Sequence, residues 1–211
     1  MPTFADYIAS SFPHGLSLPS EIRTMFDWLD KSGFTFSEPR LGQRYATVYP
    51  PHIRQKLMAP VLFHLAEKNY IPQADPIENQ RLALFITTGG DGSRAGLWLD
   101  DNGRQQFVHV GSGSGSTLLC TLADDPIDFL RLLAIGYEEL CWPEEFSTPP
   151  HMIADKPGPP VPPPAHYRHW LETTFHVTIP RTASEIVRTI SEMDDAHSDD
   201  AFWQWVRRVW K

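Results

Sequence analysis

Residues 96–110, GLWLDDNGRQQFVHV, decide the fold class of this chain. Residues 96–99 and 107–110 are short β-like runs, and 100–103 separate them. The pair Asn102-Gly103 is typical of a tight hairpin turn, in which both central residues need positive φ. The stretch therefore predicts two antiparallel strands joined by a short turn.

Similar patterns lie on both sides of this hairpin. Residues 81–87 alternate between apolar and other positions, and residues 117–122 form a further apolar run. The intervening GSGSGS at 111–116 is expected to be a flexible loop. The four runs together predict an antiparallel meander.

Two helical patterns precede the strands. The first follows Leu18-Pro19 and stops at Gly33, because proline suits a first helical turn and glycine suits a helix end. Its apolar residues recur at helical spacing, at Ile22, Met25, Phe26 and Leu29. The second runs from Pro50 to Leu65, where Pro60 predicts a kink or two short helices. Helices beside an antiparallel or mixed sheet predict an α+β fold.

A third helix is predicted after the strands. Asp125 is its natural cap, and Asp128 lies near the positive end of the helix dipole. Gly136 bends or ends this helix, and residues 137–142 predict a short further helix that ends at Pro143.

A proline-rich stretch divides the chain. Eight of residues 149–164 are proline, which favours an extended, semi-rigid tether. We therefore predict an α+β domain at 1–146, a linker at 147–165 and a helical C-terminal extension at 166–211. In the extension, a capping box at 182–185 precedes one helix and Asp199-Asp200 opens another. Trp203 and Trp205 widen the apolar stripe of that last helix, so it must dock on the main domain or on a partner.

The composition favours a cytoplasmic globular protein. Hydrophobic residues make up 41% of the 211 residues, and no apolar run is long enough for a membrane span. The N-terminus lacks the basic and apolar regions of a signal peptide, so none is expected. Cys120 and Cys141 are expected to be buried reduced thiols, as is typical of the cytoplasm.

Most of the net charge of −8 comes from residues 120–155. Eight acidic residues and one base, Arg131, give this stretch a charge of −7. Such a surface repels nucleic acid and attracts a basic protein. Helix capping and solvation are an equally good explanation of these acids. The candidate partner-binding residues are Asp124, Asp125, Asp128, Glu138, Glu139, Glu144 and Glu145.

No motif for phosphate binding, catalysis or metal binding is complete. The GSGSGS run lacks the lysine of a Walker loop, the third glycine of a dinucleotide fingerprint and the central serine of a nucleophile elbow. The nine histidines show no zinc-ligand spacing, and His166 with His169 lacks an evident third ligand. We therefore expect no enzyme activity, cofactor or metal.

Several short motifs follow one another in an order that resembles the SUKH superfamily, the Smi/Knr-like domains. They are the helix from Leu18-Pro19 to Gly33, the Gly-x-Trp element at 96–98, the run 107–110 and the pair Phe129-Leu130. The resemblance covers residues 17–142. The chain departs from the family in Lys31-Ser32-Gly33, where Asn-Gly is common, in the length of 44–80 and in the tail after 149.

The resemblance implies an α+β domain without catalytic residues. It also implies a bacterial immunity protein that binds a cognate toxin and blocks its active site, whereas eukaryotic relatives act as scaffolds. Two other hypotheses stay open. One is a regulatory or scaffold adaptor that uses the proline tract and the tryptophans at 170, 203, 205 and 210. The other is a small hydrolase or metal enzyme.

Overall fold

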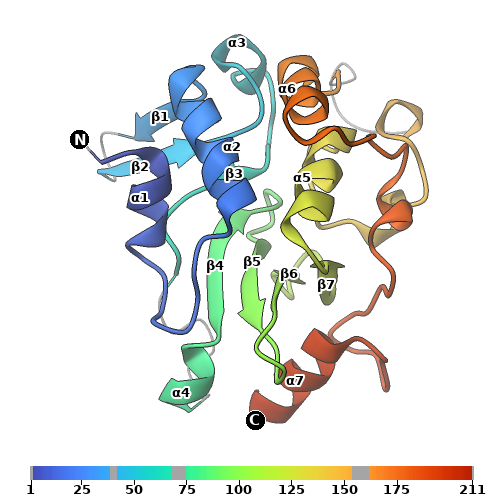
Figure 1. Ribbon diagram of the computed structural model, residues 1–211. Helices are drawn as coiled ribbons and strands as arrows, with labels where there is room; N and C mark the ends of the chain where they lie inside the picture. Colours follow the sequence, from blue (N-terminus) through green and yellow to red (C-terminus); the bar gives the residue numbers. More distant parts are fainter. Residues whose placement is uncertain (1, 39–41, 68–74, 154–161, 211) are drawn as a thin grey trace.

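The computed structural model describes residues 2–38, 42–67, 75–153 and 162–210 (Figure 1). Its centre is an open seven-stranded sheet in which every strand pairs antiparallel with its neighbours in the chain. Helices flank the sheet, which confirms the predicted α+β fold. The strands are β1 (Thr35–Glu38), β2 (Gln43–Ala46), β3 (Leu62–Phe63), β4 (Leu82–Thr87), β5 (Arg94–Leu99), β6 (Gln105–Val110) and β7 (Leu119–Ala123).

The hairpin of β5 and β6 is confirmed, but its turn is not the predicted one. Gly103 has a φ of 77°, whereas Asn102 does not have a positive φ. The backbone N–H of Asp100 donates to the Arg104 carbonyl at 2.9 Å, which leaves a longer loop with a glycine bulge. The Asp100 carboxylate favours this turn, because it accepts the N–H groups of Asn102 and Arg104 at 2.8 Å each.

The first predicted helix is confirmed as α2 (Ser20–Lys31), and Gly33 follows it with a φ of 72°. Its apolar stripe is completely buried, as the pattern predicted. The sequence does not reveal α1 (Phe4–Ala9), because six residues are too few to show a helical period. The two helices pack through Phe4 and Phe26, whose rings meet edge to face at 5.1 Å.

The helical pattern predicted from Pro50 to Leu65 is wrong beyond its first turn. The structure has a four-residue helix, α3 (Pro51–Arg54), followed by β3, which pairs with β4. Pro60 lies between them and cannot donate a helical hydrogen bond. The sequence also gave no sign of β1 and β2, since each has four residues of which two or more are polar.

The helix after the strands is confirmed as α5 (Pro126–Ile135), and Gly136 ends it with a φ of 98°. The short helix predicted at 137–142 is wrong. The chain there is irregular, because the Leu140 N–H donates to the Thr88 carbonyl at 2.8 Å instead of joining a helix. A 3-10 turn, η1 (Pro143–Glu145), follows.

The C-terminal extension docks on the main domain. In α6 (Ala165–Phe175), the Tyr167 hydroxyl donates to the Leu130 carbonyl of α5 at 3.1 Å. The predicted capping box is present, but it opens a 3-10 turn, η3 (Ala183–Glu185), and not the predicted helix. The last helix is confirmed as α7 (Ala201–Val209), and its cap is Asp200, which accepts the Trp203 N–H.

The sheet separates two apolar cores. On the face toward α5, the rings of Phe107 and Phe129 stack at 3.9 Å. On the other face, Trp98 and Val108 pack beneath α7, and the rings of Trp98 and Trp205 lie 5.6 Å apart. Alternating residues of β5 and β6 are thus buried on both faces, which requires a helix on each.

The proline-rich stretch is described only in part. Pro157, Pro159 and Pro160 lie outside the described residues, whereas η2 (Pro150–Met152) is a 3-10 turn. The remaining short helix is α4 (Pro76–Asn79). The division into a domain, a linker and an extension stays a prediction. Among the described residues, no helix has both the length and the apolar character that a membrane crossing requires.

Candidate partner-binding surface

The seven acidic residues predicted to bind a partner form two groups, one at each end of α5. Asp124, Asp125 and Asp128 lie at its start and are called the cap group below. Glu138, Glu139, Glu144 and Glu145 follow its last residue and are called the carboxylate cluster. The helix between the two groups has ten residues, a length of about 15 Å.

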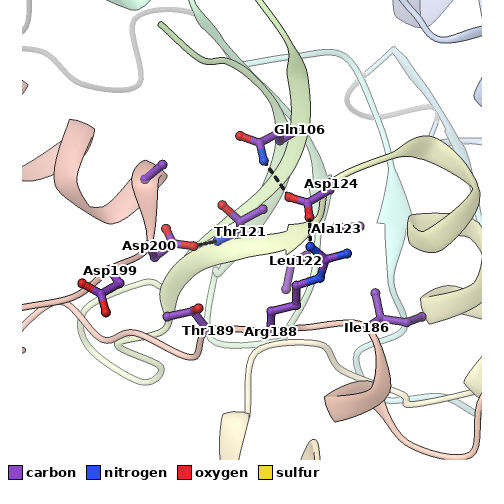
Figure 2. Close-up of a pocket in the computed structure, with 11 residues that line it drawn as sticks. Gln106, Thr121, Leu122, Ala123, Asp124, Ile186, Arg188, Thr189, Asp199 and Asp200 are labelled. Atoms are coloured by element: carbon purple, nitrogen blue, oxygen red, sulfur yellow. Dashed lines mark hydrogen bonds and ion pairs between the residues drawn. The ribbon is translucent and has the colours of Figure 1, made fainter. Parts of the chain in front are cut away.

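Both oxygens of Asp124 are engaged within the protein (Figure 2). One accepts a hydrogen bond from Gln106 Nε2 at 2.7 Å, and the other lies 2.9 Å from Arg188 Nη1. Arg188 belongs to the C-terminal extension, so the local charge count of the sequence does not include it. The ion pair is solvent-exposed and contributes little stability, but it neutralises Asp124.

The other two members of the cap group stabilise α5. The Asp125 carboxylate accepts the Asp128 N–H at 2.9 Å, which is the N-cap hydrogen bond. Asp128 lies 2.6 Å from Arg131 Nη1, one helical turn away. Helix capping and local pairing therefore explain this group.

The carboxylate cluster begins with two glutamates that bind backbone groups of neighbouring loops. Glu138 Oε1 accepts the Met58 N–H at 2.6 Å and the Ala59 N–H at 3.3 Å. Glu139 accepts the Gly90 N–H at 2.7 Å and the Trp142 indole N–H at 2.6 Å. Neither glutamate forms an ion pair with a lysine or arginine of the described residues.

Glu144 and Glu145 differ in what they contact. Glu144 is exposed and makes no side-chain hydrogen bond or ion pair with any other described residue. Glu145 is half-buried and has an interaction within the protein. The charges of Glu139 and Glu145 both act on Cys141, whose thiol pKa is raised mainly by burial. Of the four glutamates in the cluster, Glu144 alone makes no contact with the described residues, and the other three interact within the protein.

Asp91 holds the loops beside the carboxylate cluster. Its carboxylate accepts four hydrogen bonds of 2.8–2.9 Å, from the N–H and hydroxyl of Ser93, the hydroxyl of Ser112 and the N–H of Ser116. These donors outweigh partial burial and lower the Asp91 pKa to about 2. The GSGSGS loop, predicted to be flexible, is thus tied to Asp91. An added Cβ at Gly115 would lie 2.7 Å from the Asp91 Cβ.

The buried titratable groups have structural partners. The imidazole of His109 lies between the Thr88 hydroxyl, 2.9 Å away, and the Leu118 carbonyl, 3.0 Å away. Burial lowers the His109 pKa to about 4, so this imidazole is neutral near pH 7. Cys120 and Cys141 are buried free thiols, as predicted. The described residues contain no cluster of three side chains that could ligate a metal ion.

The hollow drawn in Figure 2 lies between β7, the chain around Arg188 and the start of α7. Its volume is about 170 Å³, and two other hollows on the described surface have about 260 Å³ each. These volumes are below the ~300 Å³ of typical small-molecule pockets. The charged residues that line this hollow include the paired Asp124 and Arg188. They also include Asp200, whose carboxylate accepts the Thr121 N–H at 2.9 Å.

The tryptophans of the C-terminal extension belong mainly to the protein's own packing. Trp203 and Trp205 are buried side chains of α7, and Trp170 stacks on Trp28 at 5.0 Å. Trp210 is 42% exposed. Deletion of residues 149–211 would therefore expose the apolar core that α7 covers. Loss of binding in such a deletion would then not by itself support an adaptor function.

Comparisons with known proteins return no match, neither to a family model, nor to a curated protein, nor to a solved structure. The resemblance to the SUKH superfamily thus stays a prediction that depends on the short motifs. Sequence reasoning found the acidic residues but not their neighbours Met58 and Gly90. The only signal for that loop is Pro60, which ends the helical pattern two residues after Met58.

Proposed function

We propose that this chain is a non-catalytic, cytoplasmic immunity protein that binds a cognate toxin and blocks its active site. The partner would present a basic cleft to the carboxylate cluster. The resemblance to SUKH immunity proteins supports this proposal, and so does the absence of ion-paired bases at Glu138, Glu139 and Glu144 in the described part of the chain. The buried free thiols fit a reducing compartment.

The observation that carries the proposal is the fixed position of Glu138 and Glu139. Backbone N–H groups of two loops hold these side chains, so little side-chain entropy is lost when a cation approaches them. Their negative charge is not cancelled by a described base. Such a surface attracts a cationic protein over a long range and orients it before contact.

The cluster also has the mixed chemistry of a protein interface. Met58 lies directly beside Glu138 and is 78% exposed, and Trp142 is half-buried against Glu139. Interfaces combine an apolar centre with a polar rim, and both methionine and tryptophan are enriched in them. The surface therefore offers apolar contact as well as charge.

Co-purification tests the proposal directly. The full chain, carrying an affinity tag, is expressed in its source cells, and the proteins that it retains are identified by mass spectrometry. We expect one cationic partner in a one-to-one complex whose association slows as salt rises, because the Debye length is only about 10 Å at 0.1 M ionic strength. Purified chain that retains no partner, or that turns over a small molecule, would contradict the proposal.

Replacement Glu144→Lys separates the role of the cluster from stability. Glu144 makes no described contact, so the variant should melt like the wild type. Its association rate constant with the co-purified partner should fall about tenfold at low salt, because an attraction becomes a repulsion. Asp199→Lys is the control at an exposed acid outside the cluster, since the Asp199 side chain is 92% exposed, lies 3.4 Å from the His197 imidazole and precedes α7. Equal losses in the two variants would argue against the cluster as the binding site.

A further inference from the structure

Met58 differs from the other methionines of the described chain. Its side chain is 78% exposed, the largest exposed fraction among the large apolar residues that the structure describes, whereas Met25 is completely buried in the core. Met152 is also exposed, at 62%, and lies in η2. A single exposed apolar side chain is common in proteins, so exposure alone assigns no role to Met58.

The backbone around Met58 is held in place. The N–H groups of Met58 and Ala59 both donate to Glu138 Oε1, at 2.6 and 3.3 Å. Ala59 also lies against the loop after β4, because an added Cβ at Gly90 would come within 3.1 Å of the Ala59 Cβ. The Gly90 N–H in turn donates to Glu139. The fold thus holds the backbone that carries this exposed thioether, through Glu138 and through the packing of Ala59 on the loop after β4.

We propose that Met58 is the apolar anchor of the partner interface, and that oxidation of its sulfur weakens the complex. This inference rests on the proposed function. The partner would be a cationic protein surface with an apolar recess that receives the Met58 side chain, while its lysines or arginines face Glu138 and Glu144. Charge complementarity favours this partner over a second copy of the chain, whose net charge is −8.

The chemistry needs only a peroxide as oxidant. The sulfur lone pair attacks one peroxide oxygen, the O–O bond breaks, one S–O bond forms and water leaves. The sulfur loses two electrons, and the peroxide gains them. The product is methionine sulfoxide, which is polar and no longer fits an apolar recess, and methionine sulfoxide reductases reverse the change.

The first experiment uses hydrogen peroxide and the full chain alone. Peptide mapping by mass spectrometry follows the oxidation of each methionine with time. We expect Met58 and Met152 to react with similar rates and Met25 to react at least about tenfold more slowly, since burial excludes the oxidant. Slow oxidation of Met58 would overturn the proposal, because the sulfur would then not be accessible.

The second experiment measures the Kd of the co-purified partner for variants at two positions. Met58→Gln imitates the polarity of the sulfoxide and should raise the Kd about tenfold or more, as loss of an interface anchor does. Met58→Leu should bind like the wild type and keep its affinity after peroxide treatment. Met152→Leu is the matched control and should stay sensitive to peroxide.

The outcomes separate this proposal from the proposed function. A partner whose Kd rises with Glu144→Lys but not with Met58→Gln would overturn the anchor and leave the binding function intact. Peroxide-induced loss of binding in Met58→Leu would also overturn it, because another residue would then be the target. If no partner is retained by the wild-type chain, the proposed function fails, and the anchor fails with it. Thermal melting of each variant shows whether a loss of binding comes from unfolding.

Discussion

The two ends of α5 carry acidic residues of the same type in different surroundings. In the cap group, Asp124 and Asp128 each pair with an arginine, and Asp125 caps the N-terminus of α5. In the carboxylate cluster, Glu138 and Glu139 bind backbone N–H groups and Glu144 is free of described contacts. The first group stabilises the fold, whereas no described base neutralises Glu138, Glu139 or Glu144 in the second.

The difference shows why a charge count along the sequence is a poor guide to surface potential. Residues 120–155 count as −7, but Arg188 neutralises Asp124 from more than sixty positions away in the chain. Backbone N–H groups, in contrast, are neutral donors: they hold a carboxylate in place and add no opposite unit charge. Only the three-dimensional partners distinguish the two cases.

The largest effect on stability is expected at Asp91, whose carboxylate holds the loops next to the cluster. Asp91→Asn should lower the free energy of unfolding at pH 7 by about 1–2 kcal/mol, after allowance for partial exposure. The folded-state pKa of about 2 lies below the ordinary 3.8, so the stabilisation is complete only above about pH 5 and is lost as the pH falls through 3.8 toward 2. Urea unfolding between pH 2 and pH 7 measures the free energy of unfolding of both proteins. The same pH dependence in wild type and variant would contradict this role of Asp91.

An intermediate effect is expected at Asp125. Asp125→Ala removes the N-cap hydrogen bond of α5 and should cost about 1 kcal/mol of stability. Partner affinity should not change, because the cap group lies at the far end of the helix from the cluster. Urea unfolding and a binding titration on the same variant test both statements. A weaker complex at unchanged stability would show that the cap group also takes part in partner binding.

The smallest effect is expected at the Asp124–Arg188 pair. Both side chains are solvent-exposed, so a double-mutant cycle with Asp124→Asn and Arg188→Gln should give a coupling energy below about 0.5 kcal/mol. The coupling should also shrink as salt is added. A coupling above about 1 kcal/mol would show that this pair holds the C-terminal extension in place.

The long, regular elements could be predicted from the sequence. The spacing of Ile22, Met25 and Leu29 indicates α2. The alternation in β4 and the short β-like runs of β5 and β6 indicate the meander. Short elements could not be predicted, because β1, β2 and β3 have at most four residues each. Residues 137–142 do not form the predicted helix, because a long-range hydrogen bond from Leu140 to Thr88 sets their backbone.

The candidate site was predictable in composition but not in geometry. Acidic residues are visible in a sequence, and so is the cap at Asp125. Their partners are not, because Met58 meets Glu138 across 80 positions and Gly90 meets Glu139 across 49. The role of Asp91 is equally hidden, since its donors come from two separate loops.

The order of the strands has a consequence for how the chain folds. Each strand pairs with the one before it, so the ladder can grow one hairpin at a time with little loop-closure cost. The contact of Thr121 with Asp200 instead spans 79 positions, and that of Glu78 with Trp205 spans 127. Docking of α7 is therefore expected late, and the indole of Trp98, which α7 covers, would report that step by its fluorescence.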